Sequence, residues 1–298
     1  SLSTLFFLKC KKERPLKKIL IPTDFSKNSK NSIRYAVDLF KETPCHFFIL
    51  YVNIEGSNVK EKPVYEFGTN VLVEIEPKAI NQKVMDLEKF ITSLSSKKEH
   101  HHFTTMREQG YFLTTIRRHI EEKKIDLIVM GTRGASELKE FFIGTRSGDV
   151  ITKVECDVLV VPDKVKFKNF KQVVIPIDFE ADFDDSILKK IANNITSEKA
   201  QIKLLYVTKS QIPLFDEIEI QQKQLVKLLS EKLPNPISFH RVVSKKIEDG
   251  IQIFAESMSA NLIIMISKDY GLIQRLFLDT TVEEVSFNTS IPLLSLQG

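Results

Sequence analysis

The first half of the chain alternates short strand-like runs with longer segments of helical periodicity. Strands are predicted at 17–22, 46–52, 100–108, 126–130 and 157–161. Helices are predicted at 26–41, 78–94, 111–124 and roughly 145–154. In the first helix the apolar positions follow i, i+3, i+4, i+7 spacing at Ile33, Ala36, Val37 and Phe40, and Ser26 is a suitable N-cap. Such alternation predicts a parallel sheet with helices on both faces, which binds ligands beyond the carboxyl ends of its strands.

The second half of the chain repeats the first. Ile21-Pro22-x-Asp24-Phe25 returns as Ile175-Pro176-x-Asp178-Phe179, and DLIVM at 126–130 returns as NLIIM at 261–265. Two tandem copies of one domain explain this order. The joint lies near 162–170, which is short, polar and basic, so we divide the chain into domains 1–164 and 165–298 and expect them to pack together.

Composition limits the class of protein. The 298 residues are 42% hydrophobic and 28% charged, an ordinary globular balance with room for two domains. The net charge of +4 is spread among interspersed acids and bases, without the concentrated basic stripe of a nucleic-acid binder. No apolar run approaches the roughly 18 residues of a membrane span. We therefore expect neither a nucleic-acid nor a membrane partner.

Cysteine usage and the first residues bear on location. The three cysteines, Cys10, Cys45 and Cys156, lie far apart and fit a reducing compartment better than a disulfide framework. The opening stretch 1–12 has a short apolar patch but no preceding basic region and no cleavage-like site, so it does not resemble a secretory signal. These features predict a cytoplasmic location.

Three glycines follow the strand at 126–130. Gly131 and Gly134 lie just beyond its carboxyl end, where a ligand can approach backbone that carries no Cβ. Gly144 directly precedes the next predicted helix, whose free N–H groups and dipole favour an anion. Each glycine alone is more simply a turn residue, but the three at this spacing indicate a ligand site.

Polar side chains around the same segment strengthen the prediction of a phosphate site. The hydroxyls of Thr145 and Ser147 stand at the start of the helix, where they can donate hydrogen bonds. Arg133 and Arg146 can add charge and bidentate contacts to phosphate oxygens.

The spacing Gly-x2-Gly-x9-Gly-Thr resembles the ATP-binding signature of the universal stress protein family. The flanks PTDFS at 22–26 and LIVMGTRG at 127–134 agree with that family, and the order of elements resembles it over both halves of the chain. The resemblance implies two tandem Rossmann-like domains of the adenine nucleotide alpha hydrolase-like type, each with a five-stranded parallel sheet flanked by helices. It also implies a bound adenine nucleotide, either ATP or ADP or AMP, with Mg²⁺ as a further candidate.

The resemblance also implies the site residues. Asp24 would contact the ribose region and, where a metal is bound, Mg²⁺; the alternative for Asp24 is a turn or capping acid. The residues that would line adenine and ribose are Pro22, Thr23, Val52, Met130 and Gly131. Arg133 and Gly134 would follow in the loop, and the residues that would hold the phosphates are Gly144, Thr145, Arg146 and Ser147.

The second copy departs from this signature. Ile266, Asp269 and Asp279 stand where the first copy has its glycines, and two of these are acids that would repel phosphate. Val282 replaces Ser147, although Asp178 keeps the place of Asp24. We therefore predict one nucleotide site per chain, in the first domain. The second domain is predicted to be a structural partner or a site for something other than ATP.

Other motifs add little. Adjacent strand residues point to opposite faces, so His100, His101 and His102 cannot converge on one metal ion. The sequence contains neither a Gly-x-Ser-x-Gly elbow nor a Walker-type loop.

These observations predict a binding module that signals by its nucleotide-bound state in a stress response. One alternative is a slow ATPase or phosphotransferase, although Asp24 is the only obvious carboxylate near the loop. Another is an interaction scaffold that needs no nucleotide. The apolar stretches 157–162 and 291–296 could pair within one chain as a pseudo-dimer, because such edge strands need cover. A homodimer of chains is a further open alternative.

Overall fold

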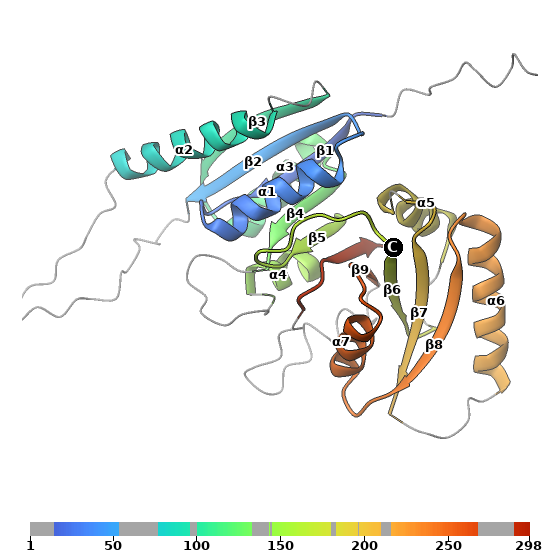
Figure 1. Cartoon of the computed structure of the whole chain (residues 1–298). Coiled ribbons are helices and arrows are strands. Elements are labelled where there is room, and N and C mark those ends of the chain that lie inside the picture. The colour runs from blue at the N-terminus through green and yellow to red at the C-terminus, as the bar shows by residue number, and fades with distance from the viewer. Residues whose placement is uncertain are drawn as a thin grey trace, which may run out of the picture.

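A computed structural model describes residues 15–53, 77–95, 100–132, 143, 145–179, 183–195, 197–209, 216–267 and 289–298. Strands and helices alternate along both halves of the chain (Figure 1). The elements of the first half are β1 (Lys17–Pro22), α1 (Lys27–Leu39), β2 (Cys45–Asn53), α2 (Pro77–Ser95), β3 (His101–Gln109), α3 (Phe112–Lys123), β4 (Leu127–Gly131), α4 (Thr145–Lys153) and β5 (Val158–Val161). Those of the second are β6 (Gln172–Ile177), α5 (Asp185–Asn194), β7 (Gln201–Thr208), α6 (Asp216–Lys232), β8 (Ile237–Val243), α7 (Ile247–Ser257), β9 (Leu262–Ser267) and β10 (Leu293–Gln297).

The strands and helices predicted for the first half are confirmed. Helix α1 begins where expected because Ser26 caps it, its hydroxyl accepting the backbone N–H of Ser29 at 3.1 Å. Its predicted apolar stripe, Ile33, Ala36, Val37 and Phe40, is buried. The segment forms a helix because this apolar stripe is buried against the sheet, although many of its other residues are polar.

The strands form one ten-stranded sheet in the order β3-β2-β1-β4-β5-β10-β9-β6-β7-β8. Within each half the pairings are parallel, as expected for a doubly wound fold. Strands β5 and β10 pair antiparallel, with Leu293 opposite Val160 and Ser295 opposite Val158. The two five-stranded sheets therefore continue into each other across the seam between the halves.

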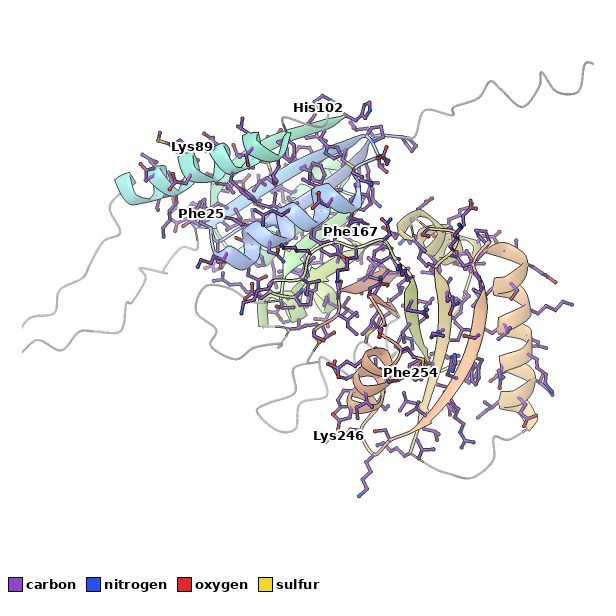
Figure 2. The ribbon with its side chains drawn as sticks, viewed as in Figure 1. Phe25, Lys89, His102, Phe167, Lys246 and Phe254 are labelled. Carbon is purple, nitrogen blue, oxygen red and sulfur yellow. The ribbon has the colours of Figure 1, made fainter. Side chains whose placement is uncertain are left out.

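Helices cover both faces of the sheet. Buried side chains of α1, α2, α5 and α6 pack on one face, and those of α3, α4 and α7 pack on the other (Figure 2). Along β1, Ile19 and Ile21 belong to the first core and Leu20 to the second. Strands buried on both faces explain why the runs in the sequence are continuously apolar rather than alternating.

The segment between the two halves is held at both ends. The side-chain amide of Asn31 in α1 donates to the carbonyl oxygens of Pro162, at 3.3 Å, and Val165, at 2.9 Å. The side-chain amide of Asn261 donates to the carbonyl oxygen of Asn169 at 3.0 Å. This segment is therefore a packed connection, as its short length suggested.

The histidine run behaves as strand geometry requires. His101 is buried and its ring lies edge-on to Phe47, at 5.1 Å between centroids. The His102 ring instead lies 6.2 Å from that of His46. Neighbouring histidines thus point to opposite faces of β3. In the described part of the chain, no group of three or more His, Cys, Asp or Glu side chains is placed to hold a metal ion.

Two cysteines lie in the described ranges. Cys45 and Cys156 are both buried, and neither is in a disulfide. Burial raises the pKa of each thiol to about 12, so both are protonated at neutral pH. Among the helices that the structure describes, none has the length and apolar character needed to cross a bilayer.

Candidate functional site

The site lies where β1 and β4 separate. These neighbouring strands pair only at Ile19 with Leu127 and at Leu20 with Ile128, whereas β1 and β2 pair at six positions. Helix α1 leaves β1 toward one face of the sheet and α4 follows β4 on the other. The order of the strands therefore reverses between β1 and β4. Open α/β sheets bind ligands at such a switch point.

The turn after β1 is tightly hydrogen-bonded. The Thr23 hydroxyl accepts the backbone N–H of Phe25 at 3.1 Å and hydrogen-bonds the Ser29 hydroxyl at 3.0 Å. The Asp24 carboxylate accepts the backbone N–H of Ser26 at 3.0 Å. Asp24 thus has the turn-forming contact considered as its alternative role, and it lies just beyond the end of β1, where β1 and β4 are no longer paired.

The end of β4 is packed against α1 through a glycine. A Cβ on Gly131 would lie 2.7 Å from the side-chain amide of Asn28, which is itself 8% exposed. This distance is too short for non-bonded atoms, so Asn28 uses the space that Gly131 leaves. The sequence suggested ligand approach as the reason for glycine here, and packing of Asn28 is a second reason that it did not reveal.

Two hydroxyls lie at the same strand end. The Ser147 hydroxyl, 2% exposed, donates to the Gly131 carbonyl oxygen at 2.9 Å and so ties the first turn of α4 to β4. The Thr132 hydroxyl is 1% exposed and has no hydrogen-bond partner among the described residues. A buried hydroxyl without a partner costs about 1 to 3 kcal/mol, and a polar ligand group at the end of β4 would remove this cost.

Some of the remaining predicted site residues lie in the described part of the chain and others do not. Pro22 ends β1, and Val52 and Met130 pack against the same core at the ends of β2 and β4. Arg146 is exposed in the first turn of α4, with its guanidinium 5.8 Å from the ring centre of Phe112.

Most of the predicted phosphate-binding loop lies outside the described residues. Thr145 begins α4, and only its backbone is described. Arg133, Gly134 and Gly144 lie outside the described residues. Their roles therefore stay predictions.

A carboxylate–imidazole pair at the end of β3 was not predicted. Glu108 lies beside Val52 in the sheet register, and its carboxylate is 2.6 Å from Nε2 of His119, a side chain 3% exposed. The same carboxylate forms an ion pair with Arg118. The two partners come from a strand and the following helix, and neither residue belongs to a recognisable motif. Sequence patterns gave no signal for this pair.

The corresponding region of the second half differs. Ile266, the counterpart of Gly131, is buried and fills the strand end with a side chain. Helix α1 begins three residues after Asp24, whereas α5 begins seven residues after Asp178, so one turn is missing from α5. The turn itself recurs, because Phe25 and Phe179 both adopt a positive φ, 66° and 63°. The second half thus keeps the turn, whereas Ile266 stands where the first half has the glycine that accommodates Asn28.

A doubly wound α/β domain, duplicated in tandem, defines the class of protein. The sequence profile of the Universal stress protein family matches residues 15–162 and again 169–296. The chain belongs to the Universal stress protein family.

Relatives match one half of the chain at a time. Universal stress protein MJ0531 of Methanocaldococcus jannaschii is 30% identical over 149 residues, which are 50% of this chain and 84% of that protein. Universal stress protein MJ0577 of the same organism is 28% identical over 156 residues, covering 50% of this chain and 96% of that protein. Each of these relatives is therefore similar to about half of this chain.

Solved structures match the whole chain. A universal stress protein from Archaeoglobus fulgidus superposes with a TM-score of 0.62 at 19% identity, covering 94% of this chain and 96% of that one. A putative universal stress protein from Pseudomonas aeruginosa gives a TM-score of 0.57 at 14% identity, covering 95% and 94%. At these identities the likeness concerns the fold.

Proposed function

We propose that the chain binds one adenine nucleotide in the crevice of its first domain and acts in a stress response or its signalling through the bound state. The observation that carries this proposal is the Thr132 hydroxyl, buried without a partner among the described residues at the separated ends of β1 and β4. It stands inside the glycine spacing that resembles an ATP-binding signature. Family membership supports the same interpretation.

The placed residues suit the parts of such a ligand. Val52 and Met130 offer apolar side chains for the adenine ring, and Pro22 and Thr23 border them at the end of β1. The amino terminus of α4 is suited to the phosphates because its first N–H groups have no partners within the helix. Asp24 carries carboxylate oxygens, the ligand type that Mg²⁺ prefers, and a bound Mg²⁺ would neutralise phosphate charge there.

The proposal does not include rapid turnover. Hydrolysis would need a general base near the phosphates. The Asp24 carboxylate already accepts a backbone N–H, and Glu108 is engaged by Arg118 and His119. Two alternatives to this proposal are a slow ATPase or phosphotransferase and an interaction scaffold that needs no nucleotide.

We also propose that the domains 1–164 and 165–298 act as an intramolecular pseudo-dimer in the cytoplasm. The antiparallel pairing of β5 with β10 supports this arrangement. A contact between Lys190 and Asp157 across the seam, at 3.0 Å, supports it as well. The second domain would then serve mainly as a structural partner of the first.

Titration calorimetry with ATP tests the nucleotide site. The experiment compares three proteins: the original chain, the variant Gly134→Asp and the matched second-domain control Asp269→Asn. We expect one nucleotide per chain, lost in Gly134→Asp because a carboxylate would meet the phosphates, and kept in Asp269→Asn. Two nucleotides per chain, or unchanged binding by Gly134→Asp, would contradict the proposal.

A further inference from the structure

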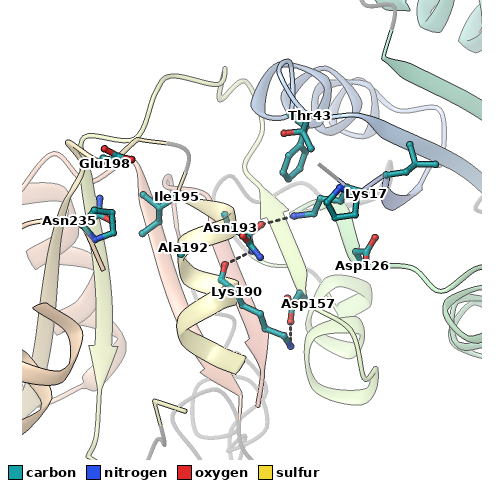
Figure 3. Close-up of a pocket in the computed structure, with 15 residues that line it drawn as sticks. Lys17, Thr43, Asp126, Asp157, Lys190, Ala192, Asn193, Ile195, Glu198 and Asn235 are labelled. Carbon is teal, nitrogen blue, oxygen red and sulfur yellow. Dashed lines mark hydrogen bonds and ion pairs between the residues drawn. The ribbon is translucent and has the colours of Figure 1, made fainter. Parts of the chain in front are cut away.

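A cavity of about 700 Å³ lies at the seam between the two domains (Figure 3). The first domain lines it where its strands begin, since Lys17 is the first residue of β1, and Asp126 and Asp157 directly precede β4 and β5. The second domain lines it with the carboxyl end of α5, residues 192–195, and with Glu198. The volume falls within the range of small-molecule sites, roughly 300 to 1,000 Å³. The proposed nucleotide site lies at the other end of β1 and β4, so this cavity is separate from it.

The ammonium group of Lys17 contacts neutral groups in the wall of this cavity. It donates to the side-chain oxygen of Asn194 at 3.1 Å and lies 4.4 Å from the ring centre of Phe40. Lys17 forms no ion pair within the described part of the chain, and the charges of Asp126 and Asp157 act on it from longer range. Burial lowers the pKa of Lys17 below its usual value of 10.5, because the charge is incompletely compensated. A ligand carboxylate would supply the missing partner.

The other lysine of the wall is already paired. Lys190 forms an ion pair with Asp157 at 3.0 Å and donates to the Gln297 carbonyl oxygen at 2.7 Å. Asp157 also accepts the backbone N–H of Gln297 at 3.0 Å. These contacts hold the wall together across the seam and neutralise one charge of each sign. The cation that remains for a ligand in this cavity is Lys17.

The carboxyl end of α5 gives the same cavity a negative side. Residues 192–195 line it, and the last carbonyl groups of a helix have no partners within the helix. The helix dipole adds partial negative charge there, and the last turn of α5 contains no basic residue to offset it. Glu198 contributes a carboxylate close to this helix end. An ammonium group of a ligand would be favoured on this side.

The two sides of opposite charge lie close together. Lys17 reaches Asn194, the last residue of α5, so a carboxylate site and an ammonium site are neighbours in the wall. Apolar side chains complete the lining, from Leu16, Phe40, Ile195 and Pro234. A matching ligand has a carboxylate and an ammonium group side by side and an apolar remainder. A free α-amino acid with an apolar side chain has this arrangement.

We propose that the seam cavity binds a free α-amino acid with an apolar side chain. The Lys17 ammonium would pair with its carboxylate. The amino group would lie at the carbonyl end of α5 near Glu198, and the side chain would contact apolar residues such as Phe40. Because both domains line the cavity, the bound amino acid would stabilise the folded arrangement of the two domains.

Titration calorimetry of the full chain with L-leucine tests this proposal. Isocaproate is leucine without its amino group, and isoamylamine is leucine without its carboxylate. L-Leucine should bind about tenfold or more tightly than either, because each truncated probe leaves one charged side of the cavity without its partner. L-Leucine should also raise the melting temperature, and ATP should not compete with it.

Variants locate the binding within the chain. Lys17→Met should raise the dissociation constant for L-leucine about tenfold or more, and Glu198→Gln should raise it several-fold. The matched controls Lys18→Met and Glu231→Gln remove the same charges from residues that do not line the cavity, and they should leave binding unchanged. Circular dichroism without ligand shows whether each variant is folded. The two truncated probes test the proposal on the original chain even if Lys17→Met does not fold.

Several results would overturn the proposal. Isocaproate binding as tightly as L-leucine would mean a simple anion site, and isoamylamine doing so would mean a cation site. Equal losses in Lys17→Met and Lys18→Met would show non-specific attraction. Competition by ATP would place the amino acid in the nucleotide site, and no binding of L-leucine by the original chain would remove the site altogether.

Discussion

The side chain of Asn28 occupies the space that a Cβ atom on Gly131 would need, at 2.7 Å. This contact joins the first turn of α1 to the last residue of β4. The bare backbone of Gly131 therefore sets how closely α1 approaches the sheet. The proposed nucleotide would therefore lie against a wall whose position depends on this contact.

Gly131→Ala should lower the free energy of unfolding by about 1 kcal/mol, the low end for overpacking, because the group it meets is a rotatable amide. Asn28→Ala in the same chain should recover most of this loss, since it frees the space. Urea unfolding of the two single variants and the double variant measures the coupling. Additive effects would show that the two side chains do not compete for space.

Ser147→Ala removes the hydroxyl that donates to the Gly131 carbonyl oxygen. Because the site is buried, we expect a loss of about 1 to 2 kcal/mol in the free energy of unfolding. Thr152→Ala is the matched control on the same helix, since the Thr152 hydroxyl only bonds back to the Gly148 carbonyl oxygen. Its effect should be clearly smaller, and an equal effect would mean that the contact of Ser147 with β4 adds nothing.

Lys17 should make stability depend on pH. Its burial lowers the pKa in the folded state below the usual value of 10.5. Between the folded and unfolded pKa values the unfolded chain binds more protons, so stability rises with pH in that window. The free energy of unfolding, relative to that of Lys17→Met, should therefore increase as the pH rises toward 10.5, the usual pKa of a lysine. A flat or falling difference would contradict the assigned burial effect.

The seam pair of Lys190 and Asp157 should contribute to stability. Asp157 is buried and also accepts the backbone N–H of Gln297 at 3.0 Å, so Lys190→Met leaves its charge poorly compensated. We expect a loss of about 2 kcal/mol, less than for a fully buried pair, because the Lys190 side chain is 33% exposed.

Lys232→Met is the control for that substitution, since its partner Asp185 is 72% exposed. Exposed ion pairs contribute about 0 to 1 kcal/mol, so this variant should differ little from the original protein. Urea unfolding measures both variants. Equal effects would mean that the seam pair is no stronger than a surface pair.

The order and type of the elements could be predicted because they depend on local patterns. The burial of Ile33 and Val37 follows directly from helical spacing, and the start of α1 follows from the capping geometry of Ser26. The duplication was visible because the Pro-x-Asp-Phe turn recurs at Phe25 and Phe179. Each of these features is encoded within a few neighbouring residues.

The contacts around the crevice could not be predicted from patterns. Asn28 meets Gly131, and Glu108 meets His119, only after helices have packed on the sheet. The unpartnered hydroxyl of Thr132 is likewise a property of packing, because the residue type alone does not show which groups find partners. Residue spacing indicated where a ligand site lies, whereas its walls are set by long-range contacts.

Photolabelling with an azido analogue of ATP, followed by peptide mass spectrometry, tests the central claim most directly. The account predicts label on first-domain peptides that contain the ends of β1, β2 or β4, around Thr23, Val52 and Met130, and competition by unlabelled ATP. Label on second-domain peptides around Asp178 or Ile266, or label that ATP does not displace, would contradict it.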